Sequence, residues 1–306
     1  MSYTQTAPTS FPVAIPGDTL PPPPRRSGLS RRQFIDEYQR PRLPVILTDA
    51  TQNWPAHSWT PDVLRDKAGQ RRVTIRTSQG TQVYLLETLC DLIAASMSGQ
   101  PAPYARNIDV ERELPELWHD IQPRLEFAQA DWKSSALLPR DFIFPNGLVE
   151  LFFGGAGSSF PQLHVDYWGM DGFLSQLYGA KEIILLAPDQ TEFVYPDEDA
   201  GLTSQIESLD NPDYDRFPLF RQAQVIRFLL QPGETLYLPN GWWHTTYMPE
   251  VSITAITATW HRHNWGQFMK QYRIRAKTHG LAKLAALAGL KALGLVLGAR
   301  DALLGR

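Results

Sequence analysis

Two histidines and one aspartate are the residues of this chain best suited to metal chemistry. His164 and Asp166 stand two apart in "PQLHVDYWG", and His244 follows two tryptophans in "PNGWWHTTYM". In a β-strand, residues i and i+2 point to the same face, so His164 and Asp166 can direct an imidazole and a carboxylate to one point. That pair alone is weak evidence, because a hydrogen-bonded surface pair has the same spacing.

His244 strengthens the case for a metal site. Its tryptophan neighbours predict burial, and a buried imidazole needs a polar partner. Two histidines and one carboxylate form the facial triad that is typical of non-haem Fe(II) oxygenases, which leaves positions open for a cosubstrate and dioxygen. A structural zinc site would need four protein ligands, whereas a catalytic zinc site with a bound water fits the same ligand count.

The elements that must position these residues are short and mostly β. From about residue 143, apolar runs alternate with Gly, Pro, Asn and Asp, which is typical of an antiparallel sandwich or barrel. Ahead of this block, Ser30-Arg31-Arg32-Gln33 fits a capping box that begins a first helix, and after Trp260 the pattern is helical to the end. We also expect strands at 43–49 and 71–78 and helices at 60–69 and 85–99.

Composition limits the class of protein. The chain has 306 residues, 43% apolar and 20% charged, with a net charge of −3, which is ordinary for a soluble globular protein and makes a nucleic-acid partner unlikely. The single cysteine, Cys90, excludes an internal disulfide and favours a reducing compartment. The first residues have no basic start followed by an apolar run, so we expect a cytoplasmic protein without a secretory signal. Residues 1–29 are rich in proline and predict an extended tail.

Three segments, in order, resemble a known family. They are "SRRQFIDEYQRPRLPVILTDATQNWPA", "HVD…GFLSQLYGAKEIILLAPDQ" and "ETLYLPNGWWHTTYM…VSITAITATW". Together they are similar to the JmjC-type, cupin-like oxygenases that depend on Fe(II) and 2-oxoglutarate, in particular the branch of the asparaginyl hydroxylase of hypoxia-inducible factor. The resemblance covers residues 30–262. It implies a mainly β fold, a double-stranded β-helix or jelly-roll barrel with flanking helices, followed by a C-terminal helical segment at 263–306.

The resemblance also implies roles for five residues. His164, Asp166 and His244 would bind Fe(II), and Lys181 would hold the distal carboxylate of the cosubstrate 2-oxoglutarate with the help of Tyr104. No catalytic residue beyond the metal ligands is implied. A lysine on an apolar strand face needs an anion or an exit to water. Counted by strand parity, the residues on the face of Lys181 are Phe173, Leu177, Ile183 and Leu185.

Some positions depart from the family pattern. Pro161 stands where a Thr or Ser is common, and Ala258 where an Asn is common, so two cosubstrate hydrogen bonds are missing or rebuilt. About two extra residues separate Asp166 from Lys181, so the loop "YWGMDG" must bulge. His261 and His263, just past the last predicted strand, could support the site or lie at the surface, which we favour.

The implied activity is hydroxylation of a C–H bond of a protein, peptide or small molecule with dioxygen, releasing succinate and CO2. The alternative is a non-catalytic, metal-binding cupin scaffold or a small-molecule binding module. The sequence does not identify the substrate.

The last 27 residues carry a separate signal. Residues 280–306 are rich in Leu and Ala and predict a long helix. Residues 264–306 contain eight Lys or Arg against one Asp. Gly294 and Gly298 form a small-xxx-small pair that would let a second helix approach closely. Two readings stay open, a homodimer through this helix or a basic amphipathic helix on an anionic membrane. The resemblance favours the dimer.

Overall fold

The computed structural model describes residues 19–77, 80–97, 100, 102–129, 131–138, 142, 148–160, 162–199, 201–209, 211–276 and 279–304. Pro161 and residues 1–18 of the predicted tail therefore lie outside the described residues. The strands are β1 Thr19–Leu20, β2 Arg25–Arg26, β3 Val45–Leu47, β4 Arg72–Thr77, β5 Gly80–Leu85, β6 Ala105–Asp109, β7 Glu150–Gly154, β8 Asp171–Tyr178, β9 Lys181–Leu186, β10 Val225–Leu230, β11 Thr235–Leu238, β12 Trp243–Tyr247 and β13 Ser252–Thr259. The α-helices are α1 Arg31–Phe34, α2 Pro61–Ala68, α3 Leu86–Ala94, α4 Val110–Glu113, α5 Trp265–Arg275 and α6 Gly280–Leu303.

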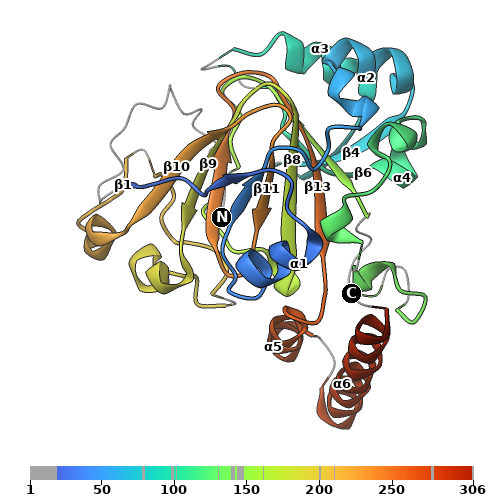
Figure 1. The fold of residues 1–306 in the computed structure, drawn as a ribbon. Coiled ribbons are helices and arrows are strands. Elements are labelled where there is room, and N and C mark those ends of the chain that lie inside the picture. The colour runs from blue at the N-terminus through green and yellow to red at the C-terminus, as the bar shows by residue number, and fades with distance from the viewer. Residues whose placement is uncertain are drawn as a thin grey trace.

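Two sheets form the barrel. The larger has the order β2-β3-β11-β8-β13-β7-β6 and the smaller the order β1-β10-β9-β12, within the described part of the chain. Figure 1 shows the strands of the two sheets side by side, with α2, α3 and α4 at one edge. An apolar core fills the space between the sheets, with Leu174 of β8 and Leu236 of β11 against Ile183 and Leu185 of β9. The mainly β jelly-roll architecture is confirmed.

The outer face of the larger sheet is covered by the N-terminal helices. Phe34 of α1 packs edge-on against Tyr237 of β11, with ring centroids 4.8 Å apart. The predicted capping box is present, because the Ser30 hydroxyl accepts from the Gln33 amide and the Gln33 side chain accepts from the Ser30 amide. Beyond Phe34 the helix widens into a π-helical turn over Ile35–Gln39.

The described part of the proline-rich tail is extended, and it joins the barrel. β1 pairs in parallel with β10, and β2 pairs in parallel with β3. Both are two-residue strands at sheet edges, a position in which prolines nearby cost no ladder hydrogen bond.

The C-terminal helices pack below one end of the barrel. Figure 1 shows α5 and α6 there, apart from the strands that they follow. One face of α6 is held by a tryptophan cluster, in which Leu290 and Leu297 contact Trp132 and Trp265. Trp132 Nε1 donates to the buried Asp301 Oδ2 at 2.6 Å. A side chain at Gly294 would collide with Trp265, so this glycine is used within the chain, and the prediction that it admits a second helix is wrong.

The opposite face of α6 is exposed and apolar. Leu281 is 84% exposed, Leu295 71% and Leu284 64%. Within the described residues, α6 is the one helix long and apolar enough to cross a membrane, which by length and composition alone is weak evidence for a span. The face needs an explanation, because large exposed apolar patches mark interaction surfaces.

Candidate metal centre and cosubstrate pocket

His164 and His244 are direct neighbours across an antiparallel β-bridge, although they lie far apart in the sequence. The His164 amide donates to the His244 carbonyl at 3.0 Å, and the His244 amide donates to the His164 carbonyl at 2.8 Å. Directly opposed residues of an antiparallel pair direct their side chains to the same face. The two imidazole rings accordingly lie with centroids 4.2 Å apart.

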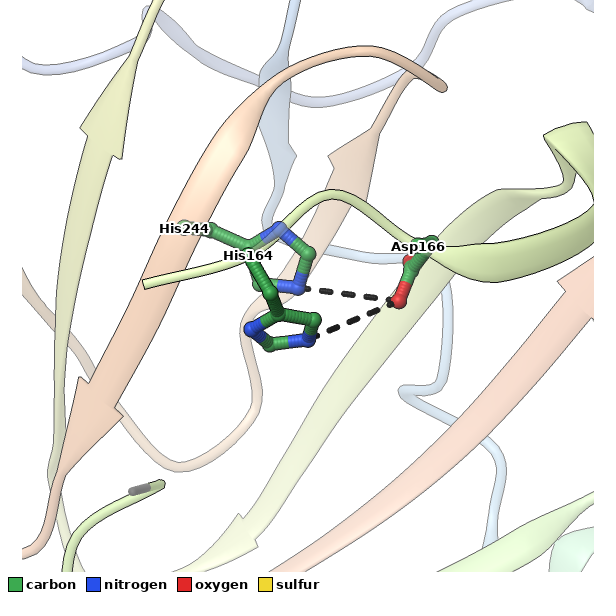
Figure 2. Close-up of side chains that lie close together, drawn as sticks. All are labelled: His164, Asp166 and His244. Carbon is green, nitrogen blue, oxygen red and sulfur yellow. Dashed lines mark ion pairs between the residues drawn. The ribbon is translucent and has the colours of Figure 1, made fainter. Parts of the chain in front are cut away.

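Asp166 completes the group from a loop. Its Oδ1 lies 3.9 Å from His164 Nε2 and 3.7 Å from His244 Nε2, and Figure 2 shows the three side chains converging. The expectation that His164 and Asp166 share a strand is wrong, because His164 forms an isolated bridge and Asp166 precedes the turn Tyr167–Gly169. The three side chains converge nonetheless. The three ligand atoms all lie within 4.8 Å of one another.

Each imidazole is oriented by its second nitrogen. His164 Nδ1 lies 3.0 Å from the Gln162 carbonyl, and His244 Nδ1 lies 3.1 Å from the Trp242 carbonyl. Since a carbonyl can only accept, each Nδ1 donates a proton to it, which leaves Nε2, on the side of Asp166, as the ring nitrogen that can bind a metal. Burial, helped by His244, holds the pKa of His164 well below its usual value, so this ring is neutral and ready to bind a metal.

A buried hydrogen-bond network supports the base of the site. Asp171 accepts from the Tyr237 hydroxyl at 2.5 Å and from the Asn240 amide at 2.9 Å, and His261 Nε2 lies 2.8 Å from it. Burial opposes the charge on Asp171, but these contacts outweigh it and its pKa ends below its usual value. The preference for a surface position of His261 is wrong, since only 5% of it is exposed. Asn240 also reaches the Asp166 carbonyl at 3.5 Å.

Lys181 and Tyr104 lie together inside the barrel. Lys181 is 1% exposed, and its Nζ lies 5.9 Å from the centre of the Tyr104 ring. Burial lowers the pKa of Lys181 from 10.5 to about 7, and no carboxylate of the described residues offsets that effect. An enclosed ammonium without a counter-ion is suited to bind an anion.

Two of the four residues predicted to share the face of Lys181 are confirmed, and two are wrong. Ile183 and Leu185 share its face and the core between the sheets. Phe173 and Leu177 belong instead to the core outside the larger sheet. The alternation of side chains along one strand does not continue across the turn at Gly179, because β8 and β9 belong to different sheets.

Two further residues line the same interior and were not singled out from the sequence. Thr246 lies two residues after His244 on β12 and is 7% exposed. Its hydroxyl makes no hydrogen bond of standard geometry among the described residues. Burial raises the pKa of the Tyr104 phenol, and the Thr246 hydroxyl lies close enough to that phenol to lower it. Arg106 of β6 stacks over Phe160 at 4.5 Å, and Phe160 in turn stacks on His164 at 4.2 Å. The spacing of Thr246 from His244 was a usable signal, since i+2 shares a strand face.

The positions that depart from the family pattern can be partly located. The loop "YWGMDG" contains a 3₁₀ turn at Tyr167–Gly169, in which Trp168 has φ 63° and Gly169 φ 65°. Two successive left-handed residues make the tight bulge that the extra length requires. Ala258 pairs with Gly172 and packs against the tryptophan cluster.

The residues present fit a resident metal and an anionic cosubstrate. Two imidazoles that present Nε2 and one carboxylate suit Fe(II), and the buried Lys181 ammonium, which has no counter-ion among the described residues, lies in the same interior. A jelly-roll barrel with an open three-ligand centre defines a cupin-type metalloprotein.

Comparison with known proteins supports the assignment to the cupin class. Residues 31–266 match the Cupin-like domain family, and the chain belongs to this JmjC-type family of Fe(II)- and 2-oxoglutarate-dependent oxygenases. It is 28% identical over 244 residues to human tRNA wybutosine-synthesizing protein 5, covering 76% of each chain. It is 32% identical over 239 residues to zebrafish (Danio rerio) lysine-specific demethylase 8, covering 74% of this chain and 55% of that protein. It is also 29% identical over 239 residues to human HSPB1-associated protein 1, covering 71% of this chain and 47% of that protein.

Proposed function

We propose that this chain is an Fe(II)- and 2-oxoglutarate-dependent hydroxylase. The observation that carries the proposal is the convergence of His164, His244 and Asp166 within 4.8 Å of one another. Iron(II) with 2-oxoglutarate and dioxygen supplies the oxidant for hydroxylation of a C–H bond, with release of succinate and CO2. The substrate is a protein, a peptide or a small molecule, and the net charge of −3 argues against a nucleic acid.

The protein's own residues have three tasks in this reaction. His164, His244 and Asp166 would hold the metal and would leave coordination positions for the cosubstrate. Lys181 attracts the distal carboxylate of 2-oxoglutarate, with Tyr104 beside it and the Thr246 hydroxyl as a hydrogen-bond donor. Because Lys181, Tyr104 and Thr246 are enclosed, water is excluded from around them, which strengthens their electrostatic contacts with a bound carboxylate.

One experiment separates this proposal from a non-catalytic cupin. Fe(II) and 2-oxoglutarate, added without oxygen, should give a weak visible charge-transfer band, and adding oxygen should then release succinate. His164→Ala, Asp166→Ala and His244→Ala should each abolish iron binding or turnover while the fold survives. Succinate release at the wild-type rate by one of these variants would remove that residue from the metal shell, and absence of the band in the wild type would leave the scaffold function.

We further propose that the exposed face of α6 mediates a homodimer. Its support is the apolar surface at Leu284 and Leu295 together with the family resemblance. Truncation after His279 would also uncover the tryptophan cluster, so the sharper variant is Leu284→Glu with Leu295→Glu, which leaves the packed face intact. Light scattering should report a monomer for this variant. A variant that stays dimeric contradicts the dimer interface, and wild-type protein that is monomeric and floats with anionic vesicles assigns the face to a membrane.

A further inference from the structure

Glu150 is a buried carboxylate with unused hydrogen-bonding capacity. It opens β7, is 7% exposed, and its Oε1 has no hydrogen-bond partner among the described residues. A buried, unpaired carboxylate oxygen is costly, and native proteins keep such groups mainly where a ligand or function uses them.

The other carboxylate oxygen of Glu150 is fixed. Asn107 Nδ2 donates to Oε2 at 2.9 Å, and Asn107 has φ 58°, a left-handed backbone that asparagine tolerates better than most residues. Asp109, the direct β6 partner of Glu150, is already engaged by the Arg112 amide at 3.3 Å. The side chain of Glu150 is therefore oriented by a specific contact and still presents a free acceptor.

Strand alternation turns Glu150 toward the barrel interior. Leu151 and Phe153 of β7 pack in the core outside the larger sheet, so Glu150 and Phe152 face the other way. Phe152 confirms this direction, because its ring lies 6.2 Å from that of Tyr104.

Glu150 also lies at the metal end of the barrel. Ile256 of β13 pairs with Glu150 on one side and with Leu174 of β8 on the other, which sets Glu150 two strand spacings, about 10 Å, from β8. Asp166 approaches β8 at Gly172, two residues from Leu174. Burial raises the pKa of Glu150, and the charges of Asp109 and Asp166 raise it further, so Glu150 lies within electrostatic range of the candidate metal ligand Asp166.

The barrel interior contains both positively and negatively charged side chains. Lys181 and Arg106 place positive charge around Tyr104, where a dicarboxylate cosubstrate would bind. Glu150 places a carboxylate two residues before Phe152 on β7, at the end of the sheet where Asp166 approaches β8. Lys133 lowers the pKa of Glu150 through its charge, but it does not fill the free oxygen. An anionic substrate group would be repelled at this position, and a cationic one would be attracted.

We propose that Glu150 binds a cationic group of the substrate, an ammonium or a guanidinium, at the metal end of the barrel. This assignment rests on the proposed hydroxylase function and specifies its substrate class. Asn107 acts as a positioning residue, since it holds the Glu150 side chain with one oxygen free.

Two isosteric probes test the assignment, namely n-butylguanidinium and neutral N-butylurea. Calorimetry on the full chain, with Fe(II) and 2-oxoglutarate under anaerobic conditions and again without them, should show that the cation binds about 10- to 100-fold more tightly, the range expected for a charge-assisted hydrogen bond. Equal affinities of the two probes, or no binding of either, would overturn the proposal.

Variants identify the group responsible. Glu150→Gln keeps the shape and a carbonyl for Asn107, and it should abolish the preference for the cation while the charge-transfer band remains. Glu150→Asp keeps the charge on a shorter side chain, so the preference should weaken but persist, which covers a Gln variant that fails to fold. Glu207→Gln, at an exposed position, is the matched control and should behave as wild type. A preference that survives in Glu150→Gln refutes the role of Glu150, whereas loss of the band in the wild type refutes the hydroxylase and leaves the probe affinities measurable.

Discussion

Replacement of Lys181 by methionine should stabilise the empty protein and destroy its affinity for 2-oxoglutarate. Burial lowers the pKa of this lysine from 10.5 to about 7, a difference worth at most about 5 kcal/mol at 1.36 kcal/mol for each pKa unit. Because the folded chain binds this proton more weakly than the unfolded chain, the cost appears as pH falls below 10.5 and is complete below about 7. Methionine has a similar length and no charge, so the cost disappears with the ammonium.

At pH 7 we expect Lys181→Met to raise the free energy of unfolding by about 1–4 kcal/mol, because relaxation already reduces the cost in the native protein. Loss of the ammonium–carboxylate contact should weaken 2-oxoglutarate binding by about 2–5 kcal/mol, or about 30- to 4000-fold. Iron affinity should hardly change. Thermal melting measures the first effect, and anaerobic titrations of Fe(II) and of the charge-transfer band measure the others. Lys270→Met, at an exposed lysine of α5, is the control. A less stable variant, or an equal loss of iron affinity, would show that Lys181 is structural and refute this reasoning.

Three other outcomes follow from the same contacts. The affinity for 2-oxoglutarate should fall about tenfold per pH unit above about pH 7, because the carboxylate binds the charged form of Lys181 and binding takes up a proton; a flat profile from pH 7 to 9 would contradict this. Thr246→Val removes only the hydroxyl, so 2-oxoglutarate binding should weaken by about 0.5–1.5 kcal/mol with iron binding unchanged, and calorimetry should detect it. Asp301→Ala leaves the Trp132 indole N–H unpaired in the core and should cost about 1–3 kcal/mol of stability; an unchanged melting temperature would show that water replaces the carboxylate.

The three candidate metal ligands could be found from the sequence because few residue types bind iron and the two segments that carry them lie within the β-rich half of the chain. The barrel was predictable for a related reason, since the runs that form β7 to β13 are short, apolar and separated by turn residues. The capping box at Ser30 was readable because its two side chains act within one helical turn. The strand and capping-box signals are local, because their physical causes lie within a few residues.

The features that the sequence did not predict depend on contacts between segments that are distant in the chain. Strand parity identifies the face of one strand but not the sheet that the strand joins, so Phe173 was assigned to the face of Lys181 although it lies outside the barrel. His261 looked exposed because its partner, Asp171, is 90 residues away in sequence. The free oxygen of Glu150 could not be foreseen, because it depends on which neighbours come within hydrogen-bonding distance.

The C-terminal helix α5 contacts the turn that follows a candidate metal ligand, Asp166. Asp166 is the one member of the triad whose backbone belongs to no strand or bridge in the described chain. The turn that follows it is held by contacts from Trp260 and from α5. Trp260 Nε1 donates to the Trp168 carbonyl at 2.8 Å, the Gln271 side chain accepts from the Trp168 amide, and Arg275 of α5 lies 4.5 Å from the Tyr167 ring. The helix α6 packs on the same tryptophan cluster, so it contacts the residues that hold the turn after Asp166. These contacts connect α6, through the tryptophan cluster, to the turn that follows Asp166. We therefore expect a partner that docks on the outer face of α6 to change the affinity of the candidate site for iron.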